Sequence, residues 1–232
     1  MTTPGVPSLA VVMPVRNAAP FVAAAIGSVL AQVPPGADIV VVDGGSDDGS
    51  AAIAAGFAGV RVLAQSGRGL AAARNQGIRT VQAEFVGFCD ADDRWAGGAL
   101  AARLAHLQRQ PDCDAVIGHV ISEALAGERI TPQQSSRLGQ PLPGFTPGAL
   151  LARRHVFERV GPFDETLTIG ADSDWFVRLE QSALRLEVLP VVVLHKGVRA
   201  ASLSTDLETY RRELLRIGRG FLERRRSLTG GR

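Results

Sequence analysis

The first half of the chain alternates between short apolar runs and amphipathic stretches. Runs of five to seven mostly branched apolar residues predict buried strands over 9–13, 38–43, 60–64 and 84–90, because a strand covered on both faces is apolar throughout. Apolar residues at helical spacing predict helices between them, over 19–32, 46–57 and 69–81. This alternation is typical of a mostly parallel sheet with helices on both faces.

The second half is less regular. Helices are predicted over 99–110, 149–161, 173–183 and 206–226, and strands over 114–121 and 186–195. Residues 122–148 are rich in Gly, Pro, Gln and Ser, and a loop of this length inside a compact domain is usually functional or mobile. No internal repeat or second core is visible, so the 232 residues suit one α/β domain with a short appendage.

Composition excludes several classes of protein. The net charge of +2 is too balanced for a dedicated nucleic-acid binder. Cys89 and Cys113 show neither zinc-ligand spacing nor a disulfide framework, which favours a reducing compartment. The first 15 residues lack the pattern of a signal peptide, and no apolar run has the length of a membrane helix. Lys196 is the only lysine among the 25 basic residues, which indicates a coding bias.

Polar residues follow the first two predicted strands. Asp43 ends a buried strand and precedes two glycines and Ser46, while Pro14 and Asn17 end the strand before it. Ligands of open α/β sheets bind beyond the carboxyl ends of the strands, where Asp43 would accept hydrogen bonds. The alternative is a turn in which Asp43, Ser46 and Asn17 only cap the following helices.

Arg74 lies in an otherwise apolar helical stretch, SGRGLAAARNQG. This stretch matches neither of the common phosphate-binding loops. A buried arginine needs an anionic partner. Asp43, Asp90 or a bound phosphate could each supply that negative charge, or Arg74 could instead face solvent. A structural ion pair is as good an explanation as ligand contact.

The segment FCDADDRW places the carboxylates of Asp90, Asp92 and Asp93 at the carboxyl end of a core strand. Mg²⁺ and Mn²⁺ suit such a pattern, since they use one or two carboxylates together with substrate phosphates. The alternative is an acidic start to the following helix, but one carboxylate would serve that purpose.

A second acidic pair, Asp172 and Asp174, begins the helix that carries Trp175. Carboxylates at a helix start often serve only as partners of the helix dipole. They could instead flank a pocket as a general base and its support.

Together these stretches resemble the family 2 glycosyltransferases with a GT-A nucleotide-diphospho-sugar fold. The resemblance covers residues 9 to about 204 and keeps five motifs in the correct order and spacing. The motifs are PVRN with the helix after it, VVVDGGSDDGS, GLAAARNQGI leading into EFVGFCDADD, VFERVGPFDETL, and GADSDWFVRL.

The resemblance implies an α/β architecture of GT-A type, with a mostly parallel, Rossmann-like central sheet and helices on both faces. Residues 1–204 would form the glycosyltransferase domain, with 1–120 as the nucleotide-sugar-binding half and 121–204 as the acceptor-side half. Residues 205–232 would add an amphipathic helix and a basic tail.

The resemblance also implies an activity: metal-assisted, inverting transfer of a sugar from a nucleotide-diphosphate sugar, with a UDP-sugar as first candidate. The nucleotide-sugar contacts would be Pro14, Val15, Asn17, Asp43, Gly44, Ser46, Gly69, Arg74, Asp90, Ala91 and Asp92. Asp92 would ligate Mn²⁺ or Mg²⁺, with Asp90 and His195 as further ligands. Asp172 would be the general base and Asp174 its fallback, and Trp175 would offer a platform to the acceptor.

Two departures from the family pattern concern the strand ends. Arg16 stands where the family often has Tyr. The segment LHKGVRAASLS resembles one that usually carries a late histidine metal ligand, and here His195 and Arg199 compete for that position. If Arg199 occupies it, the metal loses an imidazole or an arginine contacts the diphosphate directly. His195 is equally explained as a structural histidine.

Two other functions are weighed against transfer. A sugar-phosphate nucleotidyltransferase would carry a glycine-rich loop with Arg and Lys after the first strand, and PVRNAAPF lacks it. A non-catalytic nucleotide-sugar-binding module would not need to retain Asp92, Asp172 and Asp174.

The expected partners are a nucleotide-sugar donor and an acceptor that the sequence does not identify, which could be a glycan, lipid, peptide or small molecule. No nucleic acid is expected. The C-terminal helix could pack on the domain, form a homodimer or lie on an acidic membrane. The expected location is the cytoplasm, with the inner face of the membrane as an alternative.

Overall fold

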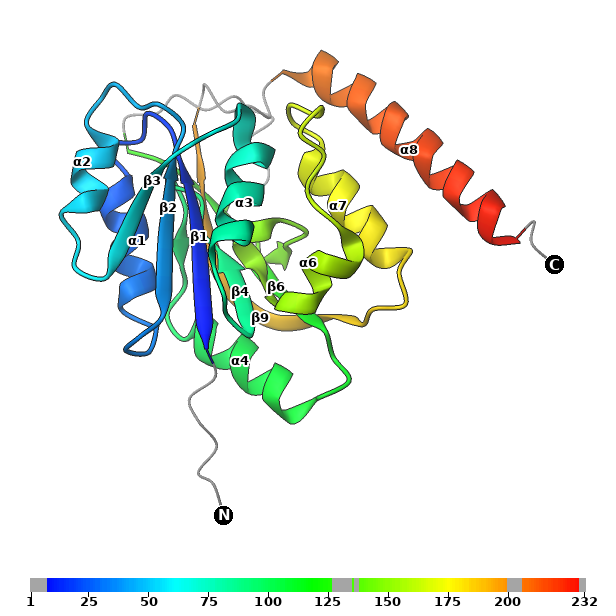
Figure 1. The fold of residues 1–232 in the computed structure, drawn as a ribbon, viewed down its shortest axis with the longest axis horizontal. Coiled ribbons are helices and arrows are strands. Elements are labelled where there is room, and N and C mark those ends of the chain that lie inside the picture. Colours follow the sequence, from blue (N-terminus) through cyan, green and yellow to red (C-terminus); the bar gives the residue numbers. More distant parts are fainter. Residues whose placement is uncertain (1–7, 127–134, 136–137, 200–205, 230–232) are drawn as a thin grey trace.

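The computed structural model describes residues 8–126, 135, 138–199 and 206–229. Within these residues a nine-stranded sheet has the order β3-β2-β1-β4-β8-β6-β9-β5, with β7 paired to β6 (Figure 1). The strands are β1 (Leu9–Val15), β2 (Asp38–Asp43), β3 (Val60–Ala64), β4 (Phe85–Phe88), β5 (Arg94–Trp95), β6 (Ala115–Ala124), β7 (Leu142–Pro143), β8 (Leu150–Arg153) and β9 (Leu186–Val198). The helices are α1 (Val22–Leu30), α2 (Ser50–Ala55), α3 (Gly69–Thr80), α4 (Ala99–Arg109), η1 (Pro147–Ala149), α6 (Arg154–Val160), α7 (Ala171–Glu180) and α8 (Leu207–Thr229).

The mostly parallel sheet expected from the alternating pattern is confirmed. Strands β3, β2, β1 and β4 are parallel, and β6 is parallel to β9. Strand β8 lies between these two parallel groups and runs antiparallel to both β4 and β6. The carboxyl ends of β1, β2 and β4 therefore lie at one edge of the sheet, next to the turn that follows β4.

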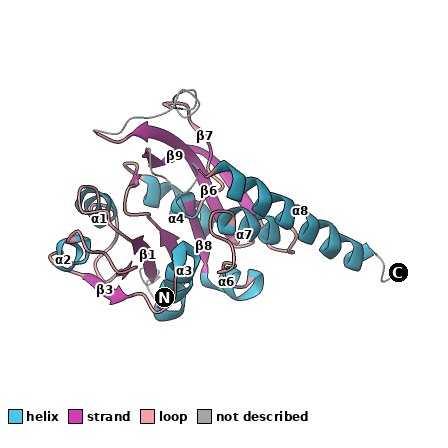
Figure 2. Cartoon of the chain, turned by 90° about the horizontal axis from the view of Figure 1, so that it is seen from above, coloured by secondary structure: helices cyan, strands magenta, loops and turns pink. Residues whose placement is uncertain are grey.

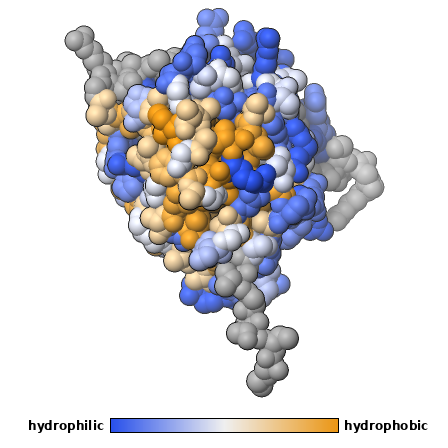
Figure 3. Space-filling model, turned by 60° about the vertical axis from the view of Figure 1, so that its left-hand side comes forward, coloured by the Kyte–Doolittle hydropathy of each residue, from blue (hydrophilic) through white to orange (hydrophobic). Residues whose placement is uncertain are grey.

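Helices cover both faces of the sheet, as predicted. Along β1, Val11 and Met13 pack with α1 and α4 on one face, while Ala10 and Val12 pack with α3, α6 and α7 on the other. The two groups of helices lie on opposite sides of the strands (Figure 2). The face of the molecule that carries α1 and α2 shows a patch of hydrophobic surface (Figure 3).

One predicted helix is wrong in its first half. The helix expected over 149–161 begins only at Arg154, and residues Leu150–Arg153 form strand β8 instead. The apolar run ALLA is too short for its period to separate helix from strand. Its backbone pairs with β4 and β6, so tertiary pairing decides the outcome. Much of the predicted loop 122–148 lies outside the described residues, although β6 extends to Ala124 and β7 falls within it.

Helix α8 packs on α7 and then runs beyond the body of the molecule (Figure 1). Ile217 belongs to the core on the α7 side. The carboxylate of Glu213 accepts hydrogen bonds from the backbone N–H groups of Thr168, Ile169 and Gly170, which lead into α7. Packing on the domain is thus observed for this helix. None of the described helices has the length and apolar character needed to cross a membrane.

Candidate functional site

A buried arginine joins three elements at the carboxyl edge of the sheet. Arg74 lies on α3, and its side chain has no exposed surface. Its Nη2 donates to both carboxylate oxygens of Asp90, at 2.9 and 3.0 Å, and its Nη1 donates to Oδ1 of Asp172 at the start of α7. Of the partners considered from the sequence, Asp90 is confirmed, whereas Asp172 was not foreseen as a partner.

Residues 90–93, which follow β4, are called the DADD turn. The other two carboxylates of this turn also have cationic partners. Oδ2 of Asp92 lies 2.8 Å from Nη2 of Arg199. Asp93 is buried, its Oδ1 accepts a hydrogen bond of 2.9 Å from the backbone N–H of Gly197, and its Oδ2 lies 3.7 Å from Nζ of Lys196. Each aspartate of the turn therefore faces its own cation, from α3 or from the end of β9.

Burial and these cations shift the pKa values of the carboxylates in different directions. Burial raises the pKa of Asp172 above its usual value, against the opposing effect of Arg74. Burial also acts on Asp90, but the charges of Arg74 and Lys196 outweigh it and lower the pKa of Asp90. Burial, helped by Asp90 and Asp92, raises the pKa of Asp93 to about 7. Both Asp93 and Asp172 have a raised pKa, which favours proton uptake, but the Asp93 side chain is fully buried while 26% of the Asp172 side chain is exposed. Asp172 is therefore the candidate base that an acceptor can reach.

The loops after β1 and β2 are tied to each other. Oδ2 of Asp43 accepts hydrogen bonds of 3.2 Å from the backbone N–H groups of both Gly45 and Ser46. Oδ1 of Asn17 accepts one of 3.0 Å from the backbone N–H of Asp47, and Gly44 donates from its backbone to the carbonyl of Val15 at 2.8 Å. These residues form turns, as the alternative predicted, but the predicted helix caps are wrong, because neither α1 nor α2 has a side-chain cap. The same loops form the rim of the sheet edge beside the DADD turn.

The remaining predicted nucleotide contacts sit around this edge. Pro14 and Val15 are buried at the end of β1, opposite Val42 and Asp43 of β2. Gly69 begins α3 with φ +85°, a conformation that glycine tolerates best. Ala91 is buried between Asp90 and Asp92.

Asp174 does not share the site of Asp172. Its Oδ2 accepts a hydrogen bond of 2.8 Å from Nε of Arg178, which also donates to the carbonyls of Val160 and Pro162. It lines a separate open hollow of about 520 Å³ with Asn75, Phe163 and other residues. The structure thus gives Asp174 a structural partner and does not place it as a second base.

Trp175 is a core side chain. It has no exposed surface and stacks between Phe157 and Phe163, with ring centroids 5.4 and 5.3 Å away, and its Nε1 donates to the carbonyl of Gly161. A ring enclosed in this way offers no face to an acceptor, so the predicted platform is wrong for this residue.

His195 also lies apart from the aspartates. Its Nδ1 is 2.7 Å from Oε1 of Glu123, and Glu123 also pairs with Arg94. Successive side chains on a strand point to opposite faces, and it is Lys196 that reaches Asp93. Between His195 and Arg199, the structure places Arg199 at Asp92.

Lys196 is a residue of this cluster that the sequence analysis did not include. Asp93 raises the pKa of Lys196 above its usual range, so the ammonium stays charged. The signal was present, since this is the only lysine of the chain and stands at the end of a predicted strand.

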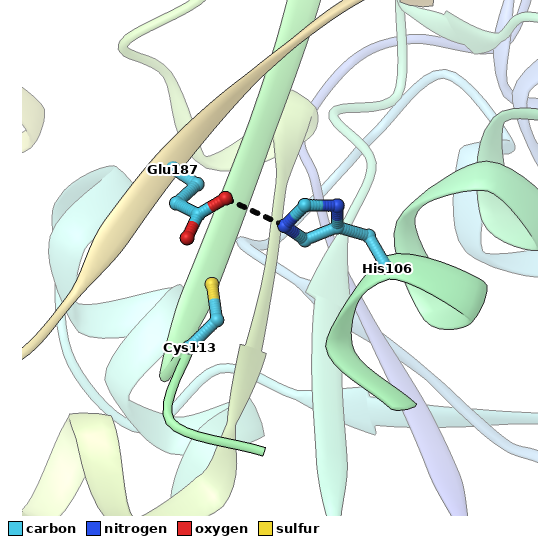
Figure 4. A group of neighbouring side chains, drawn as sticks. All are labelled: His106, Cys113 and Glu187. Atoms are coloured by element: carbon cyan, nitrogen blue, oxygen red, sulfur yellow. Dashed lines mark hydrogen bonds and ion pairs between the residues drawn. The ribbon is translucent and has the colours of Figure 1, made fainter. Parts of the chain in front are cut away.

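A further polar group consists of His106, Cys113 and Glu187, which come from different elements and lie side by side (Figure 4). Strand pairing places it at the end of the sheet opposite the DADD turn. Cys113 precedes β6, and Ala115, the first residue of β6, pairs with Ala152 of β8. Ala152 also pairs with Val86 near the amino end of β4. Nε2 of His106 is 2.7 Å from Glu187, and the thiol of Cys113 donates to the carbonyl of Ala115 at 3.2 Å. Within the described part of the chain this is the one metal-type cluster of three such ligands, and it is remote from the DADD turn.

Comparison with known proteins bears on this architecture. The family described as glycosyl transferase family 2 matches residues 10–163. EpsJ of Bacillus subtilis, named an uncharacterized glycosyltransferase, is 28% identical over 79% of this chain and 59% of its own length. ExoU of Rhizobium meliloti, named a succinoglycan biosynthesis protein, is 29% identical over 90% of this chain and 67% of its own length.

A similar solved structure is Staphylococcus aureus TarS, residues 1–349, in complex with UDP-GlcNAc. Its TM-score is 0.69 at 19% identity, over 86% of this chain and 61% of that one. The chain thus spans about three fifths of the length of EpsJ and of this TarS fragment. The likeness to TarS supports the GT-A fold, and the family match covers the sheet edge, α3 and the DADD turn. The chain belongs to glycosyl transferase family 2.

Proposed function

We propose that this protein is an inverting glycosyltransferase that moves a sugar from a nucleotide-diphosphate sugar to an acceptor hydroxyl. The observation that carries the proposal is Arg74, which holds Asp90 of the DADD turn and Asp172 of α7 together in one buried group. The donor-side turn and the candidate base thus lie next to each other. A UDP-sugar is the first donor to test, because the TarS structure is a complex with UDP-GlcNAc.

In the proposed reaction Asp172 takes the acceptor's hydroxyl proton as the acceptor oxygen attacks the anomeric carbon. Arg74 binds Oδ1 of Asp172, which leaves Oδ2 as the oxygen to receive the proton. The bond between the anomeric carbon and the diphosphate oxygen breaks, and its electron pair leaves with the nucleoside diphosphate. One base on the face opposite the leaving group gives a single displacement, which inverts the configuration.

The expected Mn²⁺ or Mg²⁺ was assigned to Asp90, Asp92 and His195. The contacts of these residues do not fit that ligand set, because Asp90 is held by Arg74, Asp92 by Arg199, and His195 by Glu123. The predicted metal assistance is therefore not carried into this proposal, and no step above is routed through a metal.

The acceptor class comes from a relative's name alone. ExoU is named for succinoglycan biosynthesis, so a growing glycan is the first acceptor to test. Membrane contact and homodimer formation also stay predictions for α8. Leu215 and Leu222, which are 67% and 52% exposed, would be the contacting side chains.

The test is a panel of nucleotide sugars with glycan acceptors, analysed by proton NMR of the product. Transfer with an inverted anomeric centre supports the proposal. A retained configuration would overturn the single displacement. If nucleotide sugars bind but none is turned over, the non-catalytic binding module is favoured. If a sugar phosphate is released only when pyrophosphate is added, the nucleotidyltransferase is favoured.

A further inference from the structure

The end of β9 is pressed against the DADD turn. A Cβ added to Gly197 would lie 2.2 Å from the backbone oxygen of Asp92, so a side chain at this position would push the strand away. The backbone N–H of Gly197 also donates to Asp93. This close contact fixes the residues on either side of Gly197 relative to the turn.

Lys196 and Arg199 are the cations that this contact brings to the turn. Arg199 pairs with Asp92 at 2.8 Å, and its guanidinium carbon lies 5.6 Å from the ring centroid of Phe21. Lys196 faces Asp93, and 41% of its side chain is exposed. Each side chain therefore pairs with a carboxylate and stays partly exposed, 27% for Arg199 and 41% for Lys196, at the edge where ligands of open α/β sheets bind.

The chemistry of these two groups suits a diphosphate. The Arg199 guanidinium is a fixed positive charge with five N–H donors, a chemistry that matches phosphate oxygens as well as the carboxylate of Asp92. An ammonium adds three donors and a compact charge. Fixed donors aimed at developing negative charge stabilise a transition state, and removing one such donor commonly costs about 10²–10³ in kcat.

The geometry points to Lys196 and Arg199 as the groups that bind the leaving diphosphate and offset its charge, so that transfer needs no divalent metal. This inference rests on the proposed function, since it names the source of positive charge in that reaction. It also explains why Arg199 pairs with Asp92. The family resemblance instead implies that Asp92 binds a metal that also has a histidine ligand.

The experiment measures donor turnover by the full chain with UDP-sugars, in EDTA and with added Mn²⁺ or Mg²⁺. We expect the rate in EDTA to be within about threefold of the rate with metal, well short of the ~10²-fold effect of losing a charge-stabilising group. The variants Lys196→Met and Arg199→Met should each lower kcat by about 10²-fold. The control Arg94→Met removes a cation that pairs with Glu123 instead, and it should keep the wild-type rate.

A conversion variant gives a second readout. Arg199→His places an imidazole beside Asp92, and we expect this variant to bind Mn²⁺, seen by electron paramagnetic resonance, and to be stimulated by it. Circular dichroism confirms the fold of each variant, and binding of UDP against uridine shows whether the diphosphate contact is lost.

The outcomes separate the two proposals. If wild-type protein turns over its donor only with added metal, or if both methionine variants keep the wild-type rate, the diphosphate role is overturned while the transferase proposal stands. If no nucleotide sugar binds with or without metal, the proposed function itself fails.

Discussion

Arg74 and Asp172 are 98 positions apart in the sequence and form an ion pair beneath the carboxyl edge of the sheet. The same guanidinium holds Asp90. One side chain therefore connects the nucleotide-sugar-binding half of the chain with the acceptor-side half.

Replacing Arg74 should destabilise the protein as well as inactivate it. Arg74→Met leaves Asp90 and Asp172 without their partner in a buried setting, and breaking a buried pair in this way costs about 3–5 kcal/mol. We expect urea unfolding to show this loss. The control is Arg79→Met on the same helix, where the exposed side chain should change stability by less than ~0.5 kcal/mol. Equal stability of the two variants would contradict the bridging role.

The two aspartates of α7 should behave differently. Asp172→Asn removes the proton acceptor, so kcat should fall by about 10²–10⁴-fold while the donor still binds. Asp174→Asn removes the partner of Arg178, so it should lower the thermal midpoint and leave kcat near the wild-type value. Steady-state kinetics and calorimetric titration of the donor measure both. Loss of donor binding in Asp172→Asn would mean that Asp172 is structural, and an equal kcat loss in Asp174→Asn would restore it as a base.

The pH dependence of stability should carry a contribution from Asp93. Its pKa is about 7 in the folded chain against an ordinary value of 3.8, so between these values the folded state binds more protons than the unfolded state. The free energy of unfolding should therefore fall as pH rises from 4 to 7 and level off above that. Urea unfolding across this range should show a shallower decline for Asp93→Asn. Parallel curves for the two proteins would show that Asp93 does not titrate this way.

Glu213 should be needed to dock α8 and to order the loop before α7. It accepts hydrogen bonds from three backbone N–H groups, and leaving buried donors unsatisfied costs about 1–3 kcal/mol. Glu213→Ala should thus lose hydrogen-exchange protection around Gly170, whereas Glu223→Ala, exposed on the same helix, should not. Unchanged protection in both would mean that α8 is held by Ile217 and its other contacts alone.

Much of the fold could be predicted because the first half of the chain repeats a strong local pattern. The strand predicted over 38–43 has its observed bounds, and the strand predicted over 84–90 ends two residues earlier, at Phe88. Their common edge carries the candidate site. Strand β8 could not be predicted, because four apolar residues become a strand only through pairing with two distant partners.

The site was predictable where a residue type is unusual for its place. Arg74 in an apolar helix and the carboxylates after β4 stood out in the sequence. Lys196 did not, since its role depends on the contact between Gly197 and the DADD turn, and that contact joins segments far apart in the chain. Trp175 shows the reverse case, because a motif position alone does not tell a buried ring from an exposed one.

The central claim is that Asp172 and the DADD turn carry sugar transfer from a nucleotide-diphosphate donor. The most direct measurement is phosphorus NMR of each candidate donor incubated with acceptor and with wild-type or Asp172→Asn protein. We expect the wild type to release the nucleoside diphosphate and the variant to lose nearly all of that release, with the donor still bound. Release of a sugar phosphate, or equal release by both proteins, would contradict it.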